Sequence, residues 1–292
     1  MKTNLSSKEK STADNAGADT SFSFPKRISS LYVAVAAPPK IEMHEGIFVA
    51  RDDLIPGGTK SRYVLKLFES VEHLVYPSYT WGGAQVALAH CARATGKKAT
   101  LFVPERKGLS EKTLSAVEIG QCDLSEYKEL EKGMRLHSGR YIDVVQVPMG
   151  FLNVLQSRAR HYAEALCADY LEVGAKSAGA EEAIASTARQ IESIHGPFNE
   201  VWSVAGSGTL SRGLQQGFIS SKIFTVQAGM ELETPGRAEI IKVKAKLDRQ
   251  ERKEAPFPSC AHYDRKAWFA CLEAFKERGA KAEKILFWNV MG

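Results

Sequence analysis

Short apolar runs alternate with longer amphipathic stretches along most of the chain. Runs rich in β-branched and aromatic residues predict strands at 30–37, 46–54, 73–80, 98–105, 142–148, 200–206, 222–229 and 285–290. Stretches with helical spacing predict helices at 86–96, 154–172, 180–196, 209–218 and 265–279. Apolar strands that alternate with helices are typical of a largely parallel sheet with helices on both faces. The predicted fold class is therefore α/β.

The first 25 residues depart from this pattern. They are polar, small and mixed in charge, and they lack the apolar core of a signal peptide. We therefore expect a disordered tail at 1–25 and a folded unit at 26–292, in which two α/β lobes can share a cleft. No run of eighteen apolar residues occurs, so the sequence predicts no membrane span.

Charge and cysteine content narrow the possible ligands only slightly. The formal net charge of +5 favours anionic ligands mildly and is compatible with nucleic acid. The five cysteines show no CxxC or Cys/His metal spacing, and the seven histidines show none either. We expect a reduced, cytoplasmic protein with buried thiols and no metal site.

Two glycine-containing turns join a predicted strand to a predicted helix. One is Ala205-Gly206-Ser207-Gly208-Thr209, and the other contains Gly82 and Gly83. Glycine permits positive φ angles and close backbone approach, and a helix N-terminus offers unpaired N–H groups to an anion. The first turn therefore predicts a phosphate cradle, although an ordinary strand-to-helix turn capped by Thr209 explains it equally well. The second can hold a carboxylate or phosphate.

A third stretch, IPGGTKSRYVLKLF at 55–68, places Lys60 behind two glycines and at the start of a helix-like apolar run. Lysines usually lie on the surface. This one precedes, in chain order, two turns that suit anions. The combination suits a phosphorylated aldehyde that is held as an imine by the lysine amine.

The same three stretches resemble the signatures of the tryptophan synthase β-like superfamily, the fold type II pyridoxal-phosphate enzymes. ARDDLIPGGTKSR resembles the segment with the Schiff-base lysine, TWGGAQVALAHCARATGKKATLFVPE the next signature, and VAGSGTLSRG the loop that binds the cofactor phosphate. The resemblance extends from about residue 45 to the C-terminus, and the superfamily includes aminocyclopropane-carboxylate deaminase, D-cysteine desulfhydrase and threonine deaminase. It implies a smaller lobe at about 78–150 and a larger lobe at 26–77 plus 151–292. A homodimer is expected by analogy.

The resemblance assigns site residues to this chain. Lys60 would hold pyridoxal 5'-phosphate covalently. Further cofactor-binding positions are Gly83, Ala205, Gly206, Ser207, Gly208, Thr209 and Asn289. The substrate side would be formed by Tyr79, Thr80, Trp81 and Gly82. Tyr263, in PFPSCAHYDRKAW, lies in a stretch that resembles the substrate-side segment of deaminase-like members. It would move protons or hold the substrate carboxylate, although a packed tyrosine with a hydrogen-bonded hydroxyl is equally compatible.

Three positions depart from the family pattern. Gly83 stands where an asparagine usually binds the cofactor's 3' oxygen, and Trp81 stands where a small hydroxylated residue is usual. The terminal strand brings Asn289 or Val290, rather than Ser or Thr, toward the pyridine nitrogen. No acidic residue is evident in the sequence to keep that nitrogen protonated.

Three functions therefore remain open. The first is a lyase that acts at the α-carbon of a free amino acid. The second is a decarboxylase for an amino acid attached to thymidine in bacteriophage DNA, which would place the chain in the host cytoplasm. The third is a cofactor-binding protein without turnover, which Gly83 and Val290 favour and which Lys60 and the phosphate cradle oppose.

Overall fold

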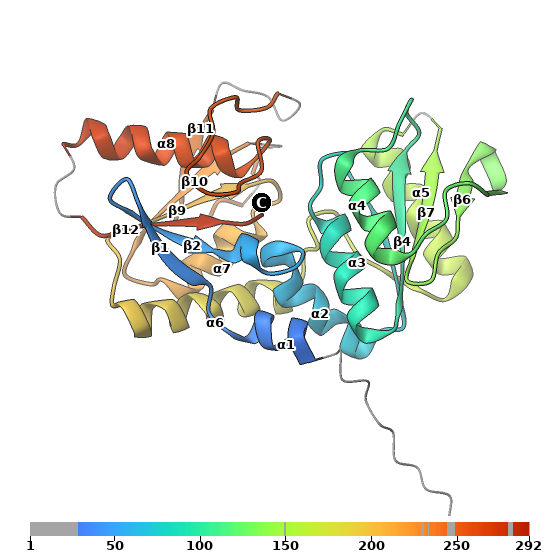
Figure 1. Ribbon diagram of the computed structural model, residues 1–292, viewed down its shortest axis with the longest axis horizontal. Coiled ribbons are helices and arrows are strands. Elements are labelled where there is room, and N and C mark those ends of the chain that lie inside the picture. The colour runs from blue at the N-terminus through green and yellow to red at the C-terminus, as the bar shows by residue number, and fades with distance from the viewer. Residues whose placement is uncertain are drawn as a thin grey trace, which may run out of the picture.

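The computed structural model describes residues 29–148, 150–228, 231–232, 234–243, 249–279 and 283–291. The chain folds into two halves, each built on a six-stranded sheet (Figure 1). The expected tail at 1–25 lies outside the described residues. The fold is α/β, as predicted from the alternation of strands and helices.

The first sheet has the strand order β1-β2-β12-β9-β10-β11. All neighbouring strands are parallel except β1 and β2, which form an antiparallel pair. The strands are β1 (Lys40–His44), β2 (Ile47–Arg51), β9 (Glu200–Ala205), β10 (Lys222–Gln227), β11 (Glu239–Lys242) and β12 (Ile285–Asn289).

Both faces of this sheet are covered, which explains why its strands are apolar throughout. Val201 of β9 is in register with Ile223 of β10 and Leu286 of β12. All three residues belong to the core on the side of the helices α6 (Ala178–His195) and α7 (Thr209–Gly217). The next residue of β9, Trp202, belongs to the core on the side of α8 (Asp264–Glu277). Figure 1 shows α8 on one side of the sheet and α6 with α7 on the other. Successive side chains of a strand point to opposite faces, so both faces need apolar residues.

The second sheet has the order β5-β6-β7-β4-β3-β8, in which β7, β4, β3 and β8 are parallel. Its strands are β3 (His73–Pro77), β4 (Lys98–Pro104), β5 (Lys128–Glu129), β6 (Arg135–His137), β7 (Ile142–Val147) and β8 (Asp169–Tyr170). The sheet thus extends beyond the residues 78–150 that were expected for the smaller lobe. The accompanying helices are α3 (Ala84–Thr95), α4 (Glu111–Gly120) and α5 (Leu152–Leu166).

Two of the predicted elements are wrong. The stretch 30–37, predicted as a strand, is the helix α1 (Ser29–Ala36). Its end is fixed by Arg62 of α2 (Ser61–Ser70), whose guanidinium donates hydrogen bonds to the carbonyls of Val35 and Ala37. The helix predicted over 154–172 ends at Leu166, because Cys167 adopts a left-handed conformation with a φ of 51°. Its last predicted residues form β8 instead.

Some shorter elements were not predicted, namely α4, β1, β11 and the β5–β6 pair.

No described helix is long and apolar enough to cross a membrane. No group of three His, Cys, Asp or Glu residues in the described part of the chain could hold a metal ion. The expectation of buried thiols is correct only for Cys91 and Cys271, since Cys167 is exposed and the other two cysteines are partly exposed.

Candidate active site

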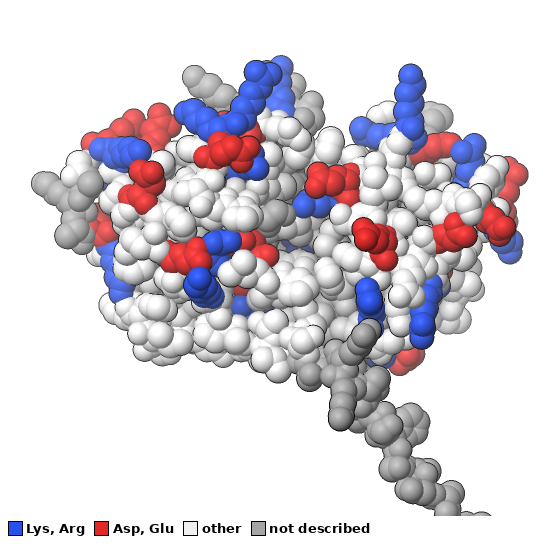
Figure 2. Space-filling model, in the orientation of Figure 1, with Lys and Arg blue, Asp and Glu red and all other residues white. Residues whose placement is uncertain are grey.

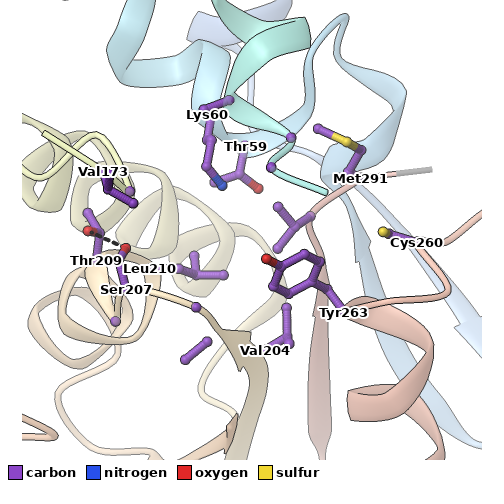
Figure 3. Close-up of a pocket in the computed structure, with 18 of the residues that line it drawn as sticks. Thr59, Lys60, Val173, Val204, Ser207, Thr209, Leu210, Cys260, Tyr263 and Met291 are labelled. Atoms are coloured by element: carbon purple, nitrogen blue, oxygen red, sulfur yellow. Dashed lines mark hydrogen bonds between the residues drawn. The ribbon is translucent and has the colours of Figure 1, made fainter. Parts of the chain in front are cut away.

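A cavity of about 390 Å³ lies between the two halves and is lined by residues from both (Figure 3). It brings together the three stretches that the sequence singled out. Of the predicted site residues, its wall contains Lys60, Tyr79, Trp81, Gly82, Gly83, Ala205, Gly206, Ser207, Gly208, Thr209 and Tyr263. The parallel strands place the loops at their carboxyl ends around this cavity, where α/β folds bind ligands.

Lys60 is positioned by two short 3₁₀ turns between β2 and α2, at Asp52–Leu54 and Gly58–Lys60. Gly57 and Gly58 both have positive φ angles, 84° and 68°. A side chain at either position would collide with neighbouring backbone, at Ala87 for Gly57 and at the Val290 carbonyl for Gly58. Two glycines are therefore required for the Lys60 turn to approach the C-terminal segment and α3.

The residues around Lys60 hold this turn on both sides. The Thr59 amide donates a 3.2 Å hydrogen bond to the Val290 carbonyl, and the Trp288 indole donates a 3.0 Å hydrogen bond to the Thr59 hydroxyl. Arg62 forms a buried ion pair with Asp52, with a shortest distance of 2.6 Å. The lysine backbone is therefore fixed, while its amine extends into the cavity (Figure 3).

The predicted phosphate cradle lies on the opposite side of the cavity. Gly208 has a φ of 81° and directly precedes α7, and the hydroxyls of Ser207 and Thr209 lie 3.2 Å apart. Behind this turn, Arg212 approaches the Ser207 carbonyl at 3.4 Å and forms an ion pair with Glu181 of α6 at 2.6 Å. Hydroxyls and free amides at the start of a nine-residue helix suit a phosphate dianion.

The predicted substrate side is the turn between β3 and α3, and its surface is largely apolar. The Trp81 ring stacks on the His262 ring of the other half, with centroids 4.2 Å apart and planes 21° from parallel. Met291 lies against Gly83, where its thioether occupies the space that a side chain at position 83 would need. The turn that was expected to hold a carboxylate is therefore covered by an indole and a thioether. Thr80, although described and partly buried, lies outside the cavity wall.

Tyr263 directly precedes α8, and its ring reaches into the cavity from the half of the molecule that is built on the first sheet. Figure 3 shows its hydroxyl and the Lys60 amine pointing into the same space. Burial raises the pKa of Tyr263 above its ordinary value, so the hydroxyl keeps its proton at neutral pH. It can therefore donate a hydrogen bond there.

Asp264 is the residue that sequence reasoning missed. It is 1% exposed, lies in the cavity wall, and accepts a 2.9 Å hydrogen bond from the Val290 amide. Burial raises the pKa of its carboxyl to about 7, against the opposing effects of the Val290 hydrogen bond and the Lys60 charge. The sequence analysis did not single out this acidic residue of the cavity wall. Asp264 was overlooked because it follows Tyr263 in a helix-like stretch with no glycine signature.

Asn289 is buried in β12 and, although described, lies outside the cavity wall, where Val290 and Met291 are found instead. Its side-chain amide nitrogen donates a 2.8 Å hydrogen bond to the Pro258 carbonyl. Its amide oxygen is buried without a partner among the described residues. The assignment of Asn289 to the cofactor remains a prediction.

No protein-family model and no curated protein sequence matches the chain. An ACC deaminase homologue superposes with a TM-score of 0.66 at 14% identity, covering 90% of this chain and 94% of that one. The processed form of threonine deaminase isoform 2 from Solanum lycopersicum gives 0.64 at 12% identity, covering 92% and 85%. A pyridoxal 5'-phosphate-dependent aspartate racemase gives 0.62 at 14% identity, covering 91% and 94%.

These three structures share one architecture with the protein over nine tenths of its length, although few of their residues are identical to it. The chain therefore has the fold of the fold type II pyridoxal-phosphate enzymes.

Proposed function

We propose that the protein is a pyridoxal-phosphate-dependent lyase that acts at the α-carbon of an amino acid. The observation that carries this proposal is the cavity that contains both the Lys60 amine and the Ser207–Thr209 turn. The donor set fits the cofactor, since an amine suits an aldehyde and hydroxyls at a helix N-terminus suit a phosphate. When bound, pyridoxal phosphate supplies an aldehyde that bonds to amines and a ring that withdraws electrons from the α-carbon.

The residues of the chain have distinct tasks in this proposal. Lys60 would hold the cofactor and, once its amine is free, move a proton at Nζ. Burial lowers the pKa of that amine, which increases the share of the neutral form that can act as a nucleophile or base. The Ser207–Thr209 turn would bind the phosphate, and Gly83 would lie beside the ring. Tyr263 would orient the substrate or donate a proton from its hydroxyl.

The experiment is an absorbance titration of the protein with pyridoxal phosphate. We expect a yellow band in the wild type that is missing in the Lys60→Ala variant. Borohydride reduction followed by mass spectrometry should place the cofactor mass on Lys60. A protein that stays colourless when saturated, or a tag on another lysine, would overturn the proposal.

A second candidate is decarboxylation of an amino acid attached to thymidine in bacteriophage DNA. The apolar covering of the β3–α3 turn by Trp81 and Met291 supports it, because an α-carboxylate in an apolar setting is destabilised relative to carbon dioxide. Mass spectrometry of modified DNA after incubation should show the loss of carbon dioxide. An unchanged mass with cofactor-loaded protein would contradict this candidate.

A third candidate, cofactor binding without turnover, is supported by the absence of an amide side chain at Gly83. It predicts the yellow band but no spectral change when amino acids or modified nucleotides are added.

By analogy with the fold we also propose a homodimer in the cytoplasm. Light scattering should then give twice the mass of one chain, and a single-chain mass would contradict the dimer.

A further inference from the structure

Lys60 and Asp264 are the only residues of opposite formal charge in the described part of the cavity wall. Their side chains come from different parts of the fold, Lys60 from the turn before α2 and Asp264 from the first residue of α8. The other wall residues are apolar or carry neutral hydroxyl and thiol groups. The charges of Lys60 and Asp264 therefore act on each other with little competition from the rest of the wall.

The backbone of Val290 fixes both residues relative to one another. Its carbonyl accepts a 3.2 Å hydrogen bond from Thr59, the neighbour of Lys60, and its amide donates a 2.9 Å hydrogen bond to Asp264 Oδ1. One residue, directly after β12, thus holds the lysine turn through its carbonyl and the carboxyl through its amide. Since only one carboxylate oxygen is occupied by this bond, the other can take part in proton exchange.

The other titratable groups near Lys60 and Asp264 cannot serve as the acid or the base in place of either residue. Burial raises the pKa values of Cys260 and Tyr263, so both stay neutral at neutral pH. Asp53, which also acts on Asp264, is paired with Arg51 through hydrogen bonds of 2.8 and 2.9 Å. Asp264 is thus the carboxylate whose charge raises the pKa of Lys60, against the lowering effect of burial.

We infer that Asp264 is the acid–base partner of Lys60, a positioning residue that stores the proton which the lysine amine gives up. A water molecule or the substrate relays the proton across the cavity: the Nζ–H bond of Lys60 breaks and an Oδ–H bond of Asp264 forms, so the pair has no net charge before or after the transfer. A buried pair that stays neutral avoids the cost of an isolated buried charge. This role of Asp264 rests on the proposed function, in which the Lys60 amine moves a proton.

The test measures the pH at which Lys60 becomes reactive in the full-length, cofactor-free protein. Acetic anhydride labelling across a pH series, read by mass spectrometry, reports Lys60 and the exposed Lys66 of α2 in the same sample. We expect Asp264→Asn to move the Lys60 midpoint down by at least one pH unit, about tenfold in labelling at a pH between the midpoints. Asp264→Glu should keep the wild-type midpoint, and Lys66 should not change in any variant. An unchanged Lys60 midpoint in Asp264→Asn would overturn the inference.

A reciprocal variant covers the case in which Asp264→Asn does not fold, as judged by circular dichroism. Lys60→Met removes the positive charge, so the pH at which Asp264 ionises should rise, as followed by carbon-13 NMR of labelled aspartate. An Asp264 titration identical to that of the wild type would contradict the pairing. Neither measurement uses the cofactor. A colourless protein with a shifted Lys60 midpoint would therefore overturn the proposed function and leave the pairing in place.

Discussion

Gly174 shows how a single residue outside the three predicted stretches shapes the site. It has a φ of 83°, and a side chain there would collide with Ser207 of the phosphate turn. Its amide also donates a 3.2 Å hydrogen bond to the Tyr76 hydroxyl. The space that Gly174 leaves empty is therefore occupied by the residue that is proposed to bind phosphate.

The Gly174→Ala variant should weaken cofactor binding at least tenfold, because the new methyl group displaces Ser207. Gly96→Ala is a matched control, since Gly96 also has a positive φ but has open space around it. Both variants should lose about 1–2 kcal/mol of unfolding free energy from the left-handed backbone. Titration with pyridoxal phosphate separates them, and equal affinities in the two variants would contradict the role of Gly174.

Asp264 allows a prediction about pH at the same scale. Burial raises the pKa of its carboxyl from the ordinary 3.8 to about 7. Between these values the folded protein holds a proton that the unfolded chain has released, so this group lowers the free energy of unfolding as pH rises from about 4 to 7.

The Asp264→Asn variant lacks that titration. The stability of the wild type relative to the variant should therefore fall from pH 4 to pH 7 and stay level above. Urea unfolding at a series of pH values measures it. Parallel curves for the two proteins would show that the folded-state pKa of Asp264 is ordinary.

At the scale of elements, the segment after β12 joins several parts of the site. Val290 bonds to Thr59 and to Asp264, and the Cys260 amide donates a 2.9 Å hydrogen bond to the Met291 carbonyl. The lysine turn, the segment before α8 and the first turn of α8 are thus all joined to the same two residues. The segment provides structural support for the site as well as part of its wall.

Removal of residues 290–292 should lower the free energy of unfolding by about 3 kcal/mol, since three hydrogen bonds of about 1 kcal/mol each are lost. It should also abolish cofactor binding, because the Lys60 turn and Asp264 lose their common anchor. Met291→Ala is the control, for it keeps the backbone bonds. Urea unfolding and the absorbance titration measure the two effects. A truncated protein that binds the cofactor like the wild type would contradict the anchoring role.

At the scale of the whole molecule, charge separates the two substrate classes. The net charge is +5, and Figure 2 shows Lys and Arg side chains along the upper edges of both halves, beside the notch between them. Exposed Arg106 and Lys107 follow β4, and Arg252 and Lys253 precede α8. Contacts between such groups and DNA phosphates would release counterions.

If DNA is the substrate, kcat/KM should fall about a thousandfold or more between 50 and 200 mM salt, as expected for six or more phosphate contacts. A free amino acid should give an almost constant kcat/KM over the same range. The comparison needs one preparation of the protein and two substrates. A flat salt profile with modified DNA would contradict a DNA-binding surface.

The main strands and helices of the fold could be predicted because their signals are local. Residues 200–205 and 223–226 are buried on both faces of a sheet, and the continuous run of apolar side chains records this in the sequence. Local signals failed for 30–37, where alanine and valine suit either structure. There the hydrogen bonds from Arg62, more than 20 residues away, stabilise a helix.

The sequence by itself determined the α/β class, because the period of apolar side chains is a local signal. It also determined the lysine behind two glycines and the glycine turn at the start of α7, because both depend on the backbone freedom of neighbouring residues. Only the tertiary structure decided that Asp264 faces the same cavity as Lys60, that Met291 fills the space beside Gly83, and that Trp81 stacks on His262. These pairs are separated by roughly 180 to 210 positions in the chain. Their contacts arise from the way the two sheets pack, and no local pattern records them.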